Sequence, residues 1–190
     1  IHAICADFSD QWQSRTTLDS GRRVIFYPGS TIGNMKPESA QSFLSNLREW
    51  IGQDGSVLIG VDLQKPENLL NAAYNDAQGA TADFNLNMLN SINDLVNADF
   101  NPDHFSHYAF YNNDQNRIEM HLTSEKSQTV KIDDNLIHFA KGETLHTENS
   151  YKYSLVSFTA LCNAAGFTLE KSWLDDEELF SVHYLSVSKS

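Results

Sequence analysis

The chain has 190 residues, of which 41% are hydrophobic and 11% are aromatic, so it is long enough to bury a substantial core. Its formal charge is −12, from 25 acidic and 13 basic side chains. Because no basic stripe compensates locally, this charge would repel phosphate backbones and anionic lipids, which argues against binding to nucleic acid or to a membrane surface.

Cysteine usage and the ends of the chain bear on its location. Cys5 and Cys162 have no CxxC or Cys/His partner at metal-ligand spacing. No apolar run approaches the ~20 residues that span a bilayer, and the first residues do not form a signal peptide. These features predict a reduced, cytoplasmic protein. The chain starts at Ile1 without an initiator Met and enters an apolar run at once, which predicts a fragment of a longer protein.

The first 80 residues alternate between strand and helix patterns. We expect buried strands at 1–6, 24–27 and 57–61, a helix from Pro37 to just before Gly52, and a helix around 69–77. Such alternation implies parallel crossover units. Open α/β sheets bind ligands at the carboxyl ends of their strands, so we expect Asp7, the loop 28–34 and Asp62 at one functional edge.

The pattern changes at about residue 81, where Asn and Asp become frequent. A helix is expected at 83–97, and alternating apolar residues then predict short strands at 105–110, 118–122, 130–132 and 137–139. Helical spacing returns at 153–165, and two strands follow at 167–174 and 180–187, joined by an acidic turn. These two strands are expected to form an antiparallel hairpin at the edge of a mixed sheet.

The predicted fold class is therefore α/β, with an inserted, mainly antiparallel α+β lobe. We expect residues 1–80 to belong to a Rossmann-like core, residues 81–146 to form the inserted lobe, and residues 147–190 to return to the core as a helix and an edge hairpin.

Two segments have the composition of a ligand site. In FYPGSTIGN (26–34) a buried strand enters a loop with two glycines, which permit close backbone approach to a ligand. An ordinary strand-to-helix connection explains this segment equally well, and it lacks the Lys-Ser/Thr ending of a phosphate loop. In residues 142–154 an acid, hydroxyls and aromatics precede a helix. There, Thr147 or Ser150 as a helix cap and Glu148 as a solvated first-turn carboxylate form the simpler interpretation.

Metal and hydrolytic sites are poorly supported. The chain has seven histidines, but His104 and His107 lie beside Pro102 without helical periodicity and lack matched third and fourth ligands. We therefore predict no metal site. There is no GxSxG nucleophile elbow and no evident Cys/His pair, so nucleophilic hydrolysis is also disfavoured.

Seven separated segments, in order, resemble the histidine-specific N-alpha-methyltransferases of ergothioneine biosynthesis and their relatives that methylate other aromatic amino acids. The segments are ADF (6–8), GSTIGN (29–34), GVDL (60–63), AYNDAQGATADFN (73–85), ADF (98–100), RIEMHL (117–122) and TENSYKY (147–153). The resemblance implies a class I methyltransferase fold and methylation of the alpha-amino group of histidine by S-adenosylmethionine, towards the trimethylated betaine.

The resemblance also assigns cofactor-binding residues. Asp7 and Phe8 match the pair after the third strand of the family, where the carboxylate binds the adenine amino group. Gly29, Ser30 and Thr31 match the loop that lines the cofactor near its sulfonium.

A second set of positions is assigned to the amino-acid substrate. Asn34 and Tyr74 match residues at its carboxylate and amino end, and Glu148 and Ser150 match the pair that contacts the imidazole nitrogens. Met120 and Phe84 resemble apolar residues that flank the ring.

The chemistry suits these residue types. A neutral amine attacks a methyl sulfonium in line, so positioning supplies most of the catalysis and no covalent nucleophile is assigned. A buried carboxylate that faces imidazole favours histidine, because an apolar aromatic substrate would leave the acid unpaired at a cost of about 1 to 3 kcal/mol.

One departure from the family is expected to matter. Its first two strands, which carry the Gly-rich cofactor loop and the ribose-binding acid, should precede Ile1. In the family's strand order 3-2-1-4-5-7-6 they lie between the runs at 1–6 and 24–27. We therefore expect no methylation by this chain alone, and exposed sheet edges that pair with a second copy.

Three alternatives stay open from the sequence. They are a methyltransferase for another aromatic amino acid, a noncatalytic amino-acid-binding module, and a redox enzyme on the same doubly wound architecture, which fold analogy alone does not exclude.

Overall fold

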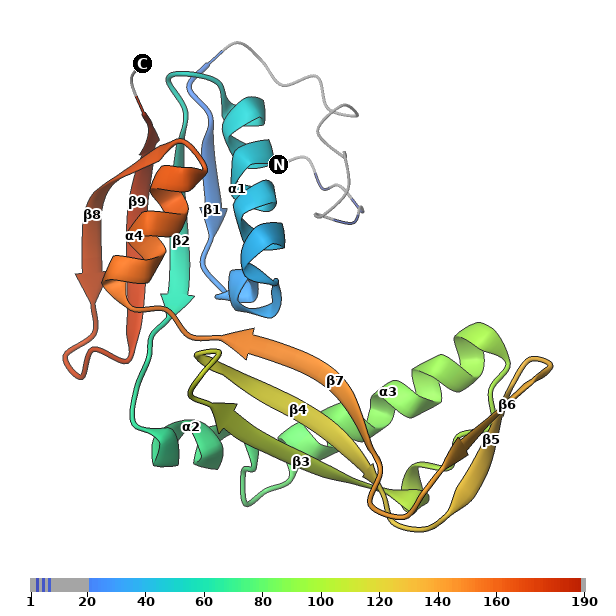
Figure 1. Ribbon diagram of the computed structural model, residues 1–190. Helices are drawn as coiled ribbons and strands as arrows, with labels where there is room; N and C mark the ends of the chain where they lie inside the picture. Colours follow the sequence, from blue (N-terminus) through green and yellow to red (C-terminus); the bar gives the residue numbers. More distant parts are fainter. Residues whose placement is uncertain (1–2, 4, 6, 8–20, 189–190) are drawn as a thin grey trace. The chain divides into compact units, whose positions relative to one another are not determined.

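The computed structural model describes Ala3, Cys5, Asp7 and residues 21–188 (Figure 1). The expected strand at 1–6 falls largely outside the described residues, and Phe8 falls outside them entirely. The chain forms two compact units. The core unit comprises residues 1–63 and 153–190, and the inserted unit comprises residues 64–152. The insertion is thus longer at both ends than the expected 81–146, because the segments on either side pack against its sheet.

A four-stranded mixed sheet forms the core unit. Its order is β1 (Val24–Tyr27), β2 (Ser56–Asp62), β9 (Phe180–Val187) and β8 (Phe167–Leu174). The β1 and β2 strands are parallel, with Val24 opposite Ser56, whereas β9 runs antiparallel to both β2 and β8. The expected parallel unit and the expected edge hairpin are both confirmed. In this arrangement β2 and β9 are the central strands, while β1 and β8 are the edges.

Two helices, α1 (Pro37–Ile51) and α4 (Leu155–Ala164), pack with this sheet (Figure 1). In α1 the buried side chains Ala40, Leu44, Leu47 and Ile51 recur at three- and four-residue spacing, which places them on one face. Pro37 occupies the first turn, where its missing N–H costs no hydrogen bond, and Gly52 follows the last turn with φ +73°. The helix therefore begins and ends where the sequence predicts.

The start of α4 corrects one sequence-based interpretation. Ser154 caps this helix, since its Oγ accepts from the Ser157 N–H at 3.0 Å while the Ser157 hydroxyl accepts from the Ser154 N–H at 2.9 Å. Thr147 and Ser150 do not cap it, and Glu148 is not a first-turn residue. All three lie in a strand, β7 (Thr144–Tyr151), which the sequence did not predict.

The inserted unit is built on a three-stranded antiparallel sheet. Its order is β3 (Phe105–Asn112), β4 (Arg117–Ser124) and β7. Two helices, α2 (Glu67–Tyr74) and α3 (Ala80–Val96), contact this sheet. A separate hairpin of β5 (Gln128–Ile132) and β6 (Asn135–Phe139) pairs in register, with Val130 opposite Ile137. The expected antiparallel strands are confirmed, and β7 adds the third member of the sheet.

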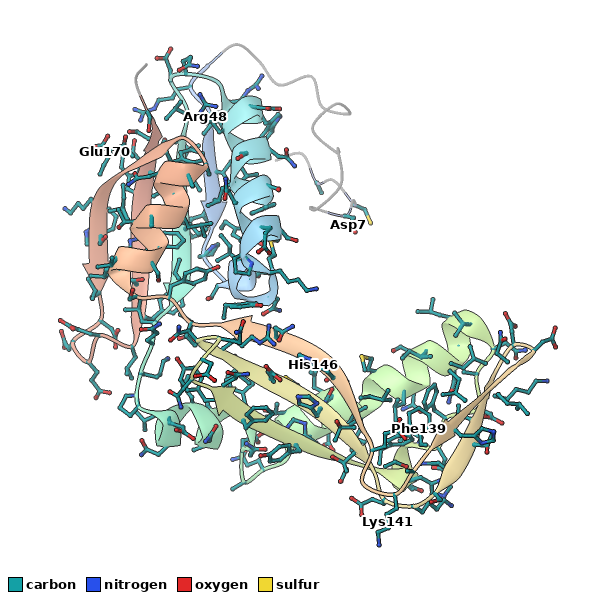
Figure 2. The ribbon with its side chains drawn as sticks, in the orientation of Figure 1. Asp7, Arg48, Phe139, Lys141, His146 and Glu170 are labelled. Atoms are coloured by element: carbon teal, nitrogen blue, oxygen red, sulfur yellow. The ribbon has the colours of Figure 1, made fainter. Side chains whose placement is uncertain are left out.

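Apolar side chains of the inserted unit form two clusters. The larger joins α3, β3, β4 and the hairpin through Leu89, Phe100, Phe105, Leu122, Val130 and Phe139. Figure 2 labels Phe139 at this cluster. The smaller cluster lies under α2 and contains Leu70, Ala109, Tyr111, Ile118 and Met120, with Tyr74 packed against it. This second cluster fixes the end of α2 against the sheet, which is where several of the expected site residues lie.

Two further features bear on sequence-based expectations. Both described cysteines are free thiols, and burial raises the pKa of Cys162 to about 12. Among the residues that the structure describes, no helix has the length and apolarity that crossing a membrane requires.

Candidate functional site

A hydrogen bond holds the loop after β1 to the end of β2. Ser30 adopts a left-handed backbone conformation with φ 55°, and its Oγ accepts from the Asp62 N–H at 2.8 Å. Gly60 lies beneath the loop, and a Cβ at this position would approach the Pro28 carbonyl oxygen to 2.1 Å. The close approach of the two backbones explains why a glycine is needed there. The carboxyl ends of the two parallel strands thus meet, as the sequence predicts for the loop and Asp62.

Gly29 is the exposed member of the cofactor-assigned residues in this loop. A Cβ there would meet only Thr31 Oγ1, at 3.6 Å. Thr31 and the exposed Asn34 lie in a 3-10 helix, Thr31–Asn34, that begins directly after Ser30. An exposed glycine backbone at the carboxyl end of a parallel strand is open to a ligand, so these residues fit the binding of S-adenosylmethionine.

The structure says less about Asp7, the residue assigned to the adenine. It is exposed and in no helix or strand, and its place near the adenine stays a prediction. Figure 2 labels its side chain.

The inserted unit brings three polar side chains into mutual hydrogen bonds. The Tyr74 hydroxyl donates to Ser150 Oγ at 2.9 Å, and Lys152 Nζ donates to both oxygens, at 2.9 Å to Tyr74 Oη and 2.8 Å to Ser150 Oγ. The Lys152 ammonium also lies 4.9 Å from the centroid of the Tyr74 ring. Lys152 is only 3% exposed, so its charge depends on these partners. We call Tyr74, Ser150 and Lys152 the hydroxyl–lysine triad.

Glu148 lies on the same strand as Ser150, two residues before it, so the two side chains project to one face of β7. Glu148 is opposite Met120 of β4 in the strand register, and Ser150 is opposite Ile118. Burial raises the pKa of the half-buried Glu148 carboxyl, and the positive charge of Lys152 opposes that rise. A desolvated carboxylate beside a thioether side chain is a suitable acceptor for a flat ring that carries an N–H.

The backbone of β3 is held to α2 by two asparagines. Asn75 exchanges two hydrogen bonds with the Ala109 backbone, at 2.9 and 3.1 Å, and Asn71 Oδ1 accepts from the Tyr111 N–H at 2.8 Å. These contacts satisfy an edge strand and fix the end of α2 that carries Tyr74.

His107 adds a further bond to this region. Its Nε2 donates to the Tyr74 carbonyl at 2.8 Å, and its Nδ1 accepts from Asn85 at 3.0 Å. These partners select the Nε2–H tautomer. His104 instead bonds Asn101 and Gln128, so the two histidines serve separate structural roles.

Of the residues assigned to the substrate, the structure brings together Tyr74, Met120, Glu148 and Ser150 within the inserted unit. Asn34 is on the core unit. Phe84 lies on α3 with its side chain 67% exposed, and its contact with a substrate ring stays a prediction. Sequence reasoning missed Lys152. The only signal was its position within TENSYKY, since a lysine in a polar segment is normally solvated.

A second polar cluster occupies the opposite face of the same sheet. Burial alone would raise the pKa of Glu119, but hydrogen bonds from Arg117, Asn112 and His121 outweigh it and hold the pKa at about 2. Arg117 bonds Glu119 Oε1 through both Nε and Nη2, at 2.9 and 2.7 Å. The His121 and His146 rings stack with their centroids 4.6 Å apart, and Figure 2 shows His146 on β7.

Nitrogen and oxygen atoms of Glu119, His121 and His146 lie within 4.8 Å of one another. However, lone pairs of stacked imidazoles lie in nearly parallel planes rather than converging, and Glu119 is already paired with Arg117. We therefore interpret this cluster as an ion pair and a ring stack on the sheet surface.

The core sheet defines the class of protein. Its order β1-β2-β9-β8, with β9 as the antiparallel strand, corresponds to strands 4-5-7-6 of the class I methyltransferase sheet. Together with the loop at the carboxyl end of β1, this is a Rossmann-like methyltransferase fold that carries an insertion.

A family model described as histidine-specific methyltransferase, SAM-dependent, matches residues 1–187, and the chain belongs to this family. It is 38% identical over 177 residues to the histidine N-alpha-methyltransferase of Mycolicibacterium smegmatis, covering 92% of this chain and 54% of that protein.

Two other relatives extend the comparison. The histidine N-alpha-methyltransferase of Mycobacterium tuberculosis is 37% identical, with 93% of this chain and 55% of that protein covered. An L-tryptophan methyltransferase of Psilocybe serbica is 28% identical, with 80% and 44% covered. The chain thus spans about half the length of the curated relatives it matches.

Proposed function

We propose that the protein transfers methyl groups from S-adenosylmethionine to the alpha-amino group of histidine, towards the trimethylated betaine. The observation that supports histidine as the substrate is the half-buried Glu148, which lies opposite Met120 and two residues before Ser150. Membership of the histidine-specific family supports the same substrate.

In this proposal Glu148 accepts a hydrogen bond from an imidazole N–H, Ser150 contacts the other ring nitrogen, and Met120 and Phe84 flank the ring. Asn34 and Tyr74 hold the carboxylate and amino end of histidine. Positioning a neutral amine in line with the methyl group is then the main catalytic task of the chain.

The cofactor-binding residues in this proposal are Asp7, Phe8, Gly29, Ser30 and Thr31. Bound S-adenosylmethionine supplies the electrophilic methyl group. The loop after β1 supplies accessible backbone near the sulfonium, since Ser30 is anchored to Asp62 while Gly29 stays exposed.

Calorimetric titration of the protein in its natural full-length form tests the substrate. Histidine is titrated in the presence of S-adenosylhomocysteine, with tyrosine and tryptophan as comparators. Selective binding of histidine supports the proposal. Binding of tryptophan or tyrosine instead would move the substrate to another aromatic amino acid, in keeping with the Psilocybe relative. Binding of none of the three would favour a different function altogether.

Replacement of Glu148 gives a sharper test. We expect Glu148→Ala to weaken histidine binding by about 1 to 3 kcal/mol, which is roughly 5- to 150-fold, because the imidazole N–H loses its acceptor. The affinity for S-adenosylhomocysteine should stay unchanged. Glu49→Ala, the same replacement at an exposed position of α1, is the matched control. Equal loss of both ligands in the Glu148 variant would contradict the assignment.

We also propose that the chain forms a homodimer through an edge of its core sheet. Within the described residues β1 is a sheet edge, and its Val24 and Phe26 are 61% and 68% exposed, which favours pairing with a second copy. Sedimentation at several concentrations should show a concentration-dependent dimer, and a monomer at all concentrations would refute the pairing.

A cytoplasmic location completes the proposal, because both described cysteines are free thiols, as is usual in a reducing compartment.

A further inference from the structure

The hydroxyl–lysine triad has a defined direction of hydrogen bonding. An ammonium has three donors and no acceptor, so Tyr74 Oη and Ser150 Oγ must both accept from Lys152. The Tyr74 proton is directed to Ser150. Ser150 Oγ therefore accepts twice, at 2.8 and 2.9 Å, which occupies both of its lone pairs.

A hydroxyl whose two lone pairs are occupied can only donate. The Ser150 proton is thus available to a ligand, while the oxygen is closed to ligand N–H groups. Without Lys152, Ser150 Oγ would accept only from Tyr74 and would keep one lone pair for a ligand N–H. The buried ammonium occupies that lone pair.

Glu148 presents the opposite polarity on the same strand face. An ionised carboxylate accepts hydrogen bonds only. Glu148 and Ser150 together therefore offer one acceptor and one donor. Neutral imidazole has one N–H and one nitrogen lone pair and satisfies both. Imidazolium has two N–H groups, so its second N–H would face the Ser150 proton. Indole has one N–H and no ring acceptor, so it would leave the Ser150 proton unpaired.

We propose that Lys152 is a specificity-determining positioning residue, which orients the Ser150 hydroxyl so that the site selects histidine with a neutral imidazole in a single tautomer. This inference rests on the proposed histidine methylation and adds the protonation state of the substrate ring.

Other titratable groups near the triad bear on its pH dependence. They are Glu148 on β7, the exposed Glu67 on α2, and Tyr111 on β3, on which both Glu67 and Lys152 act electrostatically. Glu148 is the group whose own protonation would weaken binding at low pH. Lys152→Arg keeps the positive charge that lowers the Glu148 pKa, whereas Lys152→Met removes it and raises that pKa further, and this effect would steepen the loss of binding at low pH rather than flatten it.

The direct test is nitrogen-15 NMR of ring-labelled histidine, bound to the full-length protein with S-adenosylhomocysteine, across pH 5 to 8. We expect one protonated and one unprotonated ring nitrogen throughout. The pKa of the bound imidazole should fall below its ordinary value of about 6.5. Affinity for histidine should accordingly drop about tenfold per pH unit below that value, because only the neutral ring binds. Two protonated nitrogens at pH 7 would overturn the inference.

Variants distinguish positioning from a merely structural role. Lys152→Met should weaken histidine binding at pH 8 and flatten the pH profile, because Ser150 regains a lone pair for an N–H. Lys152→Arg, which has donors only, should keep the wild-type slope. A Lys152→Met slope equal to that of the wild type would overturn the inference while leaving histidine as the substrate. Absence of histidine binding by the wild type at every pH would overturn the proposed function and this inference together.

Discussion

Replacement of Gly60 by alanine tests the link between the core sheet and the loop after β1. An added Cβ would lie 2.1 Å from the Pro28 carbonyl oxygen and 2.8 Å from Phe180 Cζ, well inside any nonbonded contact. The backbone of β2 or of the loop must therefore move. Overpacking of this kind costs about 1 to 3 kcal/mol, which lowers the urea midpoint by roughly 1 M at an m-value of about 2 kcal/mol/M.

The assay is urea unfolding followed by circular dichroism, combined with titration by S-adenosylhomocysteine. Gly60→Ala should lose stability and also cofactor affinity, because Ser30 is bonded to Asp62 at the same strand end. Gly29→Ala is the matched control for stability. Its Cβ would make one ordinary contact, at 3.6 Å, so the unfolding free energy should change by less than about 0.5 kcal/mol. Equal destabilisation by the two replacements would refute the steric reasoning.

Two further predictions concern the inserted unit. Leu89→Ala should lower the free energy of unfolding in urea by about 2 to 5 kcal/mol, because Leu89 is fully buried in the larger cluster. Leu95→Ala, at an 80% exposed position, should change it by under about 0.5 kcal/mol. Similar effects of the two replacements would contradict the assigned core. Glu119→Gln should reduce stability at pH 7. The pKa of Glu119 in the folded protein is about 2, against an ordinary 4.5. The difference in unfolding free energy between wild type and variant should therefore be full above about pH 4.5 and should shrink as the pH falls towards 2. A difference that is constant from pH 7 to 3 would exclude the Arg117 pairing as its source.

Local patterns in the sequence were sufficient for most elements of the core unit. The three- and four-residue spacing of apolar side chains in α1, bounded by Pro37 and Gly52, reflects a single helix packed on one face. The short apolar runs of β1 and β2 reflect buried strands. Because these strands pair in parallel, they need a crossover connection, and α1 provides it.

The missed strand shows where such patterns fail. In β7 the residues that face α2 include Glu148 and Ser150, so a face that would normally be apolar carries polar groups instead. The alternation that identifies a strand is absent for this reason. Placement of β7 depends on its pairing with β4, which only the folded chain supplies.

The sequence by itself determined the family and the loop that follows β1, because both depend on short runs of neighbouring residues, and the order of the core strands followed from the family resemblance. Only the tertiary structure decided that Lys152 is buried and that Tyr74, 78 residues before it, donates its proton to Ser150. Lysine is ordinarily solvated, and its burial requires acceptors that distant parts of the chain bring to it. The direction of the hydrogen bonds, and with it the polarity that the site offers a ligand, follows from that packing.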